Sequence, residues 1–279
     1  MGVKTTETDY PSVIQLVLFK EEFEVNETNG KIKKKYNNRQ IQAVIVSENT
    51  VLTAAHLLDD NLKGEGPLSF AVNDTTGARI LQNPASHNGI FLISKLNPQI
   101  YRASDSPKIK DDQFHAKGAN IAILVFPPHT FNKAVISEIS IKSIDEVSPL
   151  TMLAFGRLGT QVSENWIGSV GGADETSLLK AEIPAAAAKI VDQRLYSLAV
   201  NELGQVIGPV MSKEDSGAPI FTKDKKVFSI QIDRLVKKET NVLASFSEIL
   251  SKSKIRDIVR QAIDDGKAEG LDLLWEALK

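Results

Sequence analysis

Short apolar runs separated by turn-forming residues constrain the fold of this chain more than any other feature. The runs are a few residues long and rich in Val, Ile and Phe, a pattern that is typical of β-strands. Many short strands with little helical periodicity favour an all-β sandwich or barrel. The clearest runs are VIQLVLF (13–19), IQAVIV (41–46), IFLI (90–93), IAILVF (121–126), PLTMLAF (149–155) and VFSIQI (227–232).

Turn signals divide the chain between these runs. Pro127 and Pro128 follow the run 121–126 and end it, so a linker between two halves is expected from there to about Pro149. The lysine-rich segment 26–38 is expected to form a solvated hairpin or loop rather than a nucleic-acid patch. The segment 161–176, which contains GSVGGADET, is expected to be an exposed loop.

The last forty residues change to helical periodicity. Ser253 is expected to cap a helix that Gly266 ends, and a second short amphipathic helix is expected between Leu271 and Leu278. Both helices are expected to pack their apolar stripes against the body of the protein. The stripe of the first helix comprises Ile255, Ile258, Val259, Ala262 and Ile263.

Length and composition indicate an ordinary globular protein with one large or two smaller domains. The chain has 279 residues, of which 42% are hydrophobic and 24% charged. A net charge of -2 does not favour binding to nucleic acid or to an anionic membrane. The absence of cysteine excludes disulfides, cysteine-based metal sites and a thiol nucleophile. No apolar run approaches the roughly 20 residues needed to span a bilayer, so membrane insertion is not expected.

Three segments carry residues with reactive side chains: VLTAAHLL (51–58), GANIAILVF (118–126) and KEDSGAPI (213–220). Each is modest alone, because a lone histidine is usually structural and Asp-Ser-Gly-Ala-Pro can be a simple turn. Taken in this order, they resemble the chymotrypsin-like (trypsin-fold) serine proteases. That family carries TAAH around its base, DIALL around its acid and GDSGGP around its nucleophile. The resemblance extends from about Tyr10 to Ile263.

The resemblance implies two antiparallel β-barrels with the site in the cleft between them, followed by C-terminal helices. The expected division is a tail at 1–9, a first barrel at 10–130, a second barrel at 131–250 and a helical extension at 251–279. His56 and Asn120 would come from the first barrel and Ser216 from the second.

In such a site, Ser216 is the nucleophile and His56 the base, because a serine hydroxyl needs a base to become reactive at neutral pH. A third group, normally aspartate, holds the other nitrogen of the histidine as a donor. The matching residue here is Asn120. It is either an engineered replacement of aspartate or the natural residue of a weak or inert homologue. A third possibility, that Asp111 or Asp112 takes this role, is less favoured than a solvated acidic pair.

Two further positions depart from the family pattern. Glu214 stands where the family has the glycine whose backbone N–H forms half of the oxyanion hole, the other donor being the N–H of Ser216. A side chain and a negative charge at 214 are expected to weaken that hole. Asp215 matches an acid that in many members pairs with a new N-terminal amine after activation cleavage. No Ile/Val-Val-Gly-Gly is found, so either this branch needs no cleavage or the activation segment lies outside the chain.

The resemblance also indicates a primary specificity pocket. Its floor would be Val210, and one wall would come from about Gln231 to Asp233. An apolar floor argues against the basic-residue preference of trypsin, whereas Asp233 would narrow the pocket or attract a basic group. No preference for a particular substrate residue is therefore predicted.

Together these observations predict a serine endopeptidase, secreted or periplasmic in origin, that acts on a protein or peptide substrate and needs no cofactor. No metal site and no nucleic-acid partner are expected. His87, His115 and His129 are expected at the surface, although His115 near the acidic pair is a weak metal candidate. The rival hypothesis is an inert protease homologue that acts as a binding or scaffold protein. Asn120 and Glu214 favour this rival, whereas the intact His56 and Asp-Ser-Gly favour the enzyme.

Overall fold

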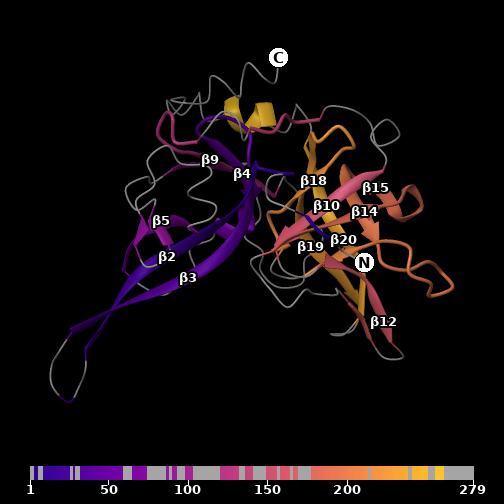
Figure 1. Ribbon diagram of the computed structural model, residues 1–279, viewed down its shortest axis with the longest axis horizontal. Helices are drawn as coiled ribbons and strands as arrows, with labels where there is room; N and C mark the ends of the chain where they lie inside the picture. The colour runs from indigo at the N-terminus through magenta and orange to yellow at the C-terminus, as the bar shows by residue number, and fades with distance from the viewer. Residues whose placement is uncertain are drawn as a thin grey trace.

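Strands make up most of the structure, which confirms the predicted all-β class. Nearly all the strands form two mainly antiparallel sheets, each curled into a half-barrel, and a short helix lies near the C-terminus (Figure 1). The computed structural model describes residues 3–5, 9–25, 28, 32–58, 65–73, 86–87, 90–92, 98–102, 120–131, 136–140, 149–155, 158–163, 166–168, 177–212, 215–237, 241–250 and 255–260.

The first sheet has eight strands in the order β6-β7-β5-β2-β3-β4-β9-β8, and all its pairs are antiparallel. Two of its strands form a long hairpin that extends beyond the body of the protein, and their pairing includes residues 32–38 of the predicted hairpin or loop (Figure 1). The strands are β2 (Val13–Val25), β3 (Ile32–Ile45), β4 (Thr50–Ala54), β5 (Glu65–Asn73), β6 (Ser86–His87), β7 (Ile90–Leu92), β8 (Gln99–Arg102) and β9 (Ile121–Val125).

The second sheet has ten strands, with the main path β1-β14-β10-β18-β19-β20-β13-β12 and a β15–β16 hairpin joined to β20. One pair, β13 with β20, is parallel. Two short strands, β11 (Leu158–Gly159) and β17 (Val210–Met211), pair separately. The other strands are β1 (Val3–Lys4), β10 (Leu150–Phe155), β12 (Gln161–Ser163), β13 (Trp166–Gly168), β14 (Leu178–Ile183), β15 (Ala188–Val191), β16 (Arg194–Leu198), β18 (Pro219–Phe221), β19 (Val227–Lys237) and β20 (Asn241–Ile249).

The prediction of an exposed loop at 161–176 was wrong for its first half. β12 and β13 form a short antiparallel hairpin, with Val162 opposite Ile167 and Ser163 opposite Trp166. Branched and aromatic side chains favour this pairing, although each strand is too short to show an alternating pattern in the sequence. Val162 is exposed, as expected of an edge strand, and residues 169–176 lie outside the described residues.

The predicted linker between the halves bonds to both sheets. Ser137 N–H donates to the carbonyl of Ile45 in the first sheet (3.0 Å). Val227 N–H, at the start of β19 in the second sheet, donates to the carbonyl of Glu138 (2.8 Å). The connection therefore ties the two half-barrels together at this point.

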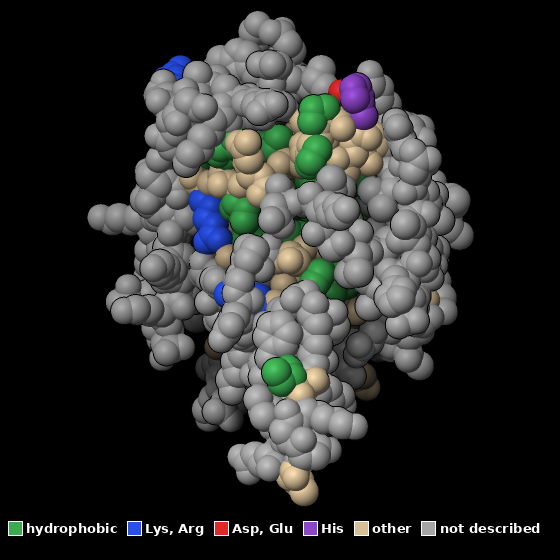
Figure 2. All heavy atoms as spheres, turned by 90° about the vertical axis from the view of Figure 1, so that its left-hand side faces the viewer, with side chains coloured by type: hydrophobic (Ala, Val, Ile, Leu, Met, Phe, Trp, Pro, Cys, Tyr) green, Lys and Arg blue, Asp and Glu red, His purple; other side chains and the backbone are tan. Residues whose placement is uncertain are grey.

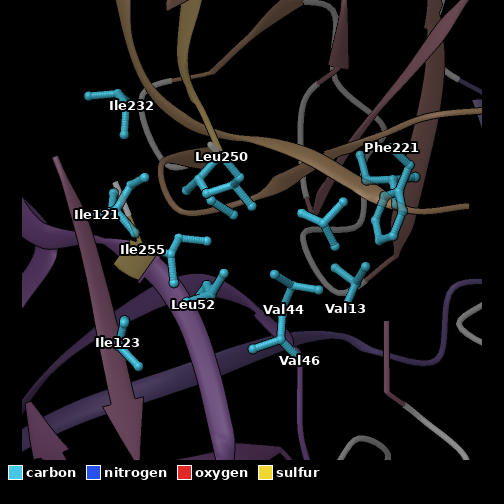
Figure 3. Packing of buried hydrophobic residues seen from close by; sticks show 14 of the residues in the cluster. Val13, Val44, Val46, Leu52, Ile121, Ile123, Phe221, Ile232, Leu250 and Ile255 are labelled. Carbon is cyan, nitrogen blue, oxygen red and sulfur yellow. The ribbon is translucent and has the colours of Figure 1, made fainter. Parts of the chain in front are cut away.

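An apolar cluster fills the space between the two sheets. Figure 3 shows side chains from the first sheet facing side chains from the second, with Ile255 between them. The helix at 255–260 contributes Ile255, Ile258 and Val259, all buried, which confirms that this part of the predicted helix packs on the body. The predicted cap, the predicted end at Gly266 and the second helix lie outside the described residues.

The described part of the chain contains no helix with the length and apolar character needed to cross a bilayer. The predicted division at 1–9, 10–130, 131–250 and 251–279 stays a prediction. Val3 and Lys4, in the predicted tail, form a strand at the edge of the second sheet beside β14.

Candidate functional site

His56 lies on a short 3-10 helix, η1 (Ala55–Leu58), directly after β4. β4 is buried along its whole length, so the chain can reach the surface only where the strand ends. Two guanidinium groups hold the carbonyl end of this helix. Arg39 Nη2 donates to the carbonyl of Leu57, and Arg102 Nη2 donates to the carbonyl of Leu58 at 2.6 Å. Cations at the end of a helix satisfy carbonyls that have no partner within it, and these two bonds lie at the two residues that follow His56.

Asn120 is held beside His56 by strand pairing. It directly precedes β9, and β9 pairs with β4 so that Ile121 lies opposite Ala54. The backbone N–H of His56 donates to Asn120 Oδ1 at 3.0 Å, and Asn120 is 5% exposed. The ring nitrogen Nδ1 of His56 lies 3.3 Å from Asn120 Oδ1 and 3.2 Å from Asn120 Nδ2. The structure therefore brings together the predicted base and the predicted orienting residue.

This contact allows either tautomer of His56. If Nδ1 carries the proton, it donates to Asn120 Oδ1, and Nε2 has the lone pair that a base needs. If Nδ1 is unprotonated, Asn120 Nδ2 donates to it, and Nε2 carries the proton instead. A carboxylate in the same place can only accept, so it would select the first tautomer. The amide at 120 removes that selection.

Ser216 lies in a tight turn between β17 and β18 and is 5% exposed. Backbone bonds define the turn: Asp215 N–H donates to the carbonyl of Ser212 (3.3 Å), and Ala218 N–H donates to the carbonyl of Asp215 (3.1 Å). The Oγ of Ser216 donates to the carbonyl of Ile232 in β19 at 2.8 Å. Attack by this oxygen would require the hydroxyl to turn from that carbonyl to a base.

Gly217 is the point at which this turn meets the first sheet. Its φ is +88°, and a Cβ atom added there would lie 2.1 Å from the carbonyl oxygen of Gln42 and 2.5 Å from Thr53 Oγ1. Only glycine fits such a close approach of two backbones. Thr53 belongs to the strand that leads into His56, so the turn of Ser216 packs directly against that strand.

The predicted pocket residues are more deeply buried than a substrate-facing wall would be. Val210 and Gln231 are both 0% exposed, and Gln231 Nε2 donates to the carbonyl of Leu153 within the second sheet (2.7 Å). Asp233 is half-buried, and its Oδ1 accepts the N–H of Arg234 at 2.7 Å. Of the predicted wall, Asp233 is therefore the residue with a partly exposed carboxylate.

Several predicted residues lie outside the described part of the chain: Glu214, Asp111, Asp112 and His115. Of the two predicted oxyanion donors, the N–H of Ser216 lies in the described part of the chain, and its role stays a prediction. His129 is exposed, as predicted, and its Nδ1 lies 3.6 Å from Glu48. His87 lies in β6. Among the described residues, no group of three or more acidic or histidine side chains is arranged to hold a metal ion.

Sequence reasoning missed one residue of this region, Gln42. It lies in β3, is 1% exposed, and donates from Nε2 to Asp215 Oδ1 at 2.8 Å. The available signal was a polar residue inside the apolar run 41–46. A buried amide in such a run needs hydrogen-bond partners, but the sequence does not show where they lie.

A cavity of about 350 Å³ lies elsewhere, among the N-terminal segment, the linker and the β18–β19 turn. The rings of Tyr10 and Phe221 meet there with centroids 5.2 Å apart. Lys226 bonds to Glu138, and this contact raises the pKa of Lys226. The lining of this cavity includes none of the candidate catalytic residues. On the face in Figure 2, hydrophobic side chains show in several separate places, Lys and Arg show in a few others, and a histidine lies beside an acidic side chain near the upper right.

No protein-family model matches the sequence, and no curated protein matches it.

Proposed function

We propose that this chain is a trypsin-fold serine endopeptidase, with Ser216 as nucleophile, His56 as base and Asn120 in the orienting position. The observation that carries the proposal is the contact of His56 Nδ1 with the Asn120 amide, at 3.2–3.3 Å, next to a strand on which the Ser216 turn is seated. The three residues come from both sheets. A structural histidine would not require the Asp-Ser-Gly turn to pack against its own strand.

The proposed reaction uses groups of the chain alone. Ser216 Oγ attacks the carbonyl carbon of a peptide bond, and His56 Nε2 takes the hydroxyl proton. The backbone N–H of Ser216 donates to the oxyanion that forms, together with a second donor predicted at Glu214. His56 then gives its proton to the leaving amine, and an ester to Ser216 remains. Water attacks this ester by the same steps in reverse, so that an acid is released and Ser216 Oγ regains its proton.

Asn120 lowers the rate of this reaction by two effects. It lets His56 occupy the tautomer that has no lone pair on Nε2, and it supplies no negative charge to stabilise the imidazolium. In trypsin-like proteases an amide at this position costs about 10⁴ in kcat. The chain as it stands is therefore expected to be slow, and Asn120→Asp is expected to restore much of the rate.

Labelling by a fluorophosphonate, followed by intact mass, tests the proposal. The reagent phosphonylates an activated serine, so the rate of a single mass addition reports the Ser216–His56 pair. We expect slow labelling of the chain and labelling ~10³–10⁴-fold faster for Asn120→Asp. Ser216→Ala and His56→Ala in the same background are the controls and should abolish it. A folded Asn120→Asp protein that is not labelled would overturn the proposal.

One observation favours the second candidate, an inert homologue that binds proteins or peptides. Ser216 Oγ donates to the carbonyl of Ile232, a stable arrangement in which the hydroxyl is not activated. Together with the amide at 120, this arrangement suits a site that has lost catalysis. Absence of labelling in both forms, with an unchanged fold, would select this alternative.

A further inference from the structure

Gln42 contacts the residues on both sides of Ser216. Its side chain bonds to Asp215, and its backbone carbonyl lies where a Cβ on Gly217 would clash, 2.1 Å from that position. Gln42 belongs to the first sheet, whereas Asp215 and Gly217 belong to the turn between two strands of the second. One residue of the first sheet therefore touches the candidate nucleophile's turn at two places.

The direction of the Gln42 amide is fixed by Phe155 in β10. Phe155 N–H donates to Gln42 Oε1 at 3.1 Å, and Gln42 Nε2 lies 3.2 Å from the carbonyl of Phe155. If the amide were reversed, its NH₂ group would face the N–H of Phe155, and two donors would meet. The contacts therefore determine which atom is oxygen and which is nitrogen. The remaining N–H of Nε2 then points at Asp215 Oδ1. The donor is oriented before it meets the carboxylate.

Asp215 in turn holds the turn together. Its side chain is 0% exposed, and its Oδ2 accepts the N–H of Ser212 at 2.7 Å. A buried carboxylate is stable only when donors surround it, and losing one donor costs more than a neutral hydrogen bond contributes. Gln42 and Ser212 therefore supply two of the N–H groups that hold the Asp215 carboxylate in place. A displacement of Asp215 would therefore also displace the backbone of the turn, including Ser216.

We propose that Gln42 is a positioning residue, which holds the Ser216 turn in its working geometry by donating from the first sheet to the buried Asp215. The inference rests on the proposed function in assigning Ser216 as the nucleophile. In this chain the neutral side-chain amide of Gln42 is a partner of Asp215. In many trypsin-like proteases the partner of the matching acid is a newly formed N-terminal amine. Order in the turn then depends on contact between the two sheets.

Gln42→Glu tests this role, because it keeps the size of the side chain and replaces the donor by an acid. Two adjacent carboxyl groups share one proton at low pH, whereas at higher pH both are charged and repel each other. Hydrogen exchange of the amides at 212–218, compared with the parent at each pH, should be little changed near pH 5. Near pH 9 it should be faster by about 10- to 100-fold, the effect of losing a hydrogen bond to a buried charge.

Fluorophosphonate labelling in the Asn120→Asp background should fall in parallel with the loss of protection. Asp215→Asn added to Gln42→Glu should rescue both readouts, because the new amide donates to the new carboxylate. Gln40→Glu is the matched control. It lies on the same strand but is exposed, and its Oε1 only accepts, from Gln15 Nε2 at 3.0 Å. If Gln42→Glu does not fold at high pH, Gln42→Met should give faster exchange at every pH.

The outcomes separate the two proposals. Exchange and labelling in Gln42→Glu equal to those in Gln40→Glu at every pH would overturn the positioning role. A pH-dependent loss of protection that Asp215→Asn reverses would support it. If the Asn120→Asp parent is not labelled while the exchange still responds, Gln42 holds the turn and it is the protease function that fails.

Discussion

Replacing Gly217 by alanine should destabilise the protein far more than a usual Gly-to-Ala change. The φ of +88° places alanine in the left-handed region, which costs about 1–2 kcal/mol. The new Cβ would lie 2.1 Å from a backbone carbonyl, and the shift needed to relieve such overpacking costs about 1–3 kcal/mol. That shift also disturbs the bond from Thr53 Oγ1 to the carbonyl of Gln42 (2.7 Å), which is worth about 1 kcal/mol. The expected loss is about 3–6 kcal/mol.

Urea unfolding followed by tryptophan fluorescence measures this loss, and Gly204→Ala is the control. Gly204 also has a positive φ, +75°, but nothing lies within 4 Å of its added Cβ. It should therefore show the conformational cost alone, about 1–2 kcal/mol. The difference between the two variants isolates the contact between the Ser216 turn and the first sheet. Equal unfolding midpoints for the two variants would refute the close packing on which the candidate site depends.

Two further predictions concern stability. Arg194 Nε bonds to Glu248 Oε1 at 2.8 Å, and Glu248 is 2% exposed, so Arg194→Met should cost about 3–5 kcal/mol by urea unfolding. The double variant Arg194→Met with Glu248→Met should recover most of the lost unfolding free energy. A double variant no more stable than Arg194→Met would contradict this. Ile258→Ala should cost about 2–5 kcal/mol because it opens a cavity between the sheets, whereas exposed Asp257→Ala should stay within about 0.5 kcal/mol. Similar values for these two would mean that the helix does not pack there.

The strands that could be predicted from the sequence are those whose side chains are apolar on both faces of the sheet. β4 and β9 are buried at every position, and their unbroken runs of apolar and β-branched residues identify them in the sequence. The outer part of the β2–β3 hairpin and the β12–β13 hairpin carry no such run. The sequence indicated the first of these as a hairpin or loop at 26–38, whereas the three-residue strands β12 and β13 are too short to show a pattern.

The candidate site was predictable where a residue type is tied to a local motif. His56, Asn120 and Ser216 stand in three recognisable segments, and the structure places His56 and Asn120 in contact. Gln42 stands in no motif, and its partner Asp215 is 173 residues away in the chain. Such a contact depends on how two sheets approach each other, which neither strand propensity nor spacing encodes.

Two kinds of contact join the half-barrels, and they do different work. The apolar cluster supplies most of the attraction, but it is non-directional and fixes no angle between side chains. The polar contacts are directional. Those of Gln42 with Asp215 and Phe155 cross between the sheets and set where the turn lies, whereas the bond from His56 N–H to Asn120 lies within the first sheet and sets where the histidine lies. Asn120 shows the consequence. Its Oδ1 accepts the N–H of His56 as a carboxylate oxygen would, so the backbone around the site is satisfied by either residue. The difference between amide and acid is confined to the ring of His56, so under the proposed function this asparagine keeps the backbone of the site and lowers only the expected rate.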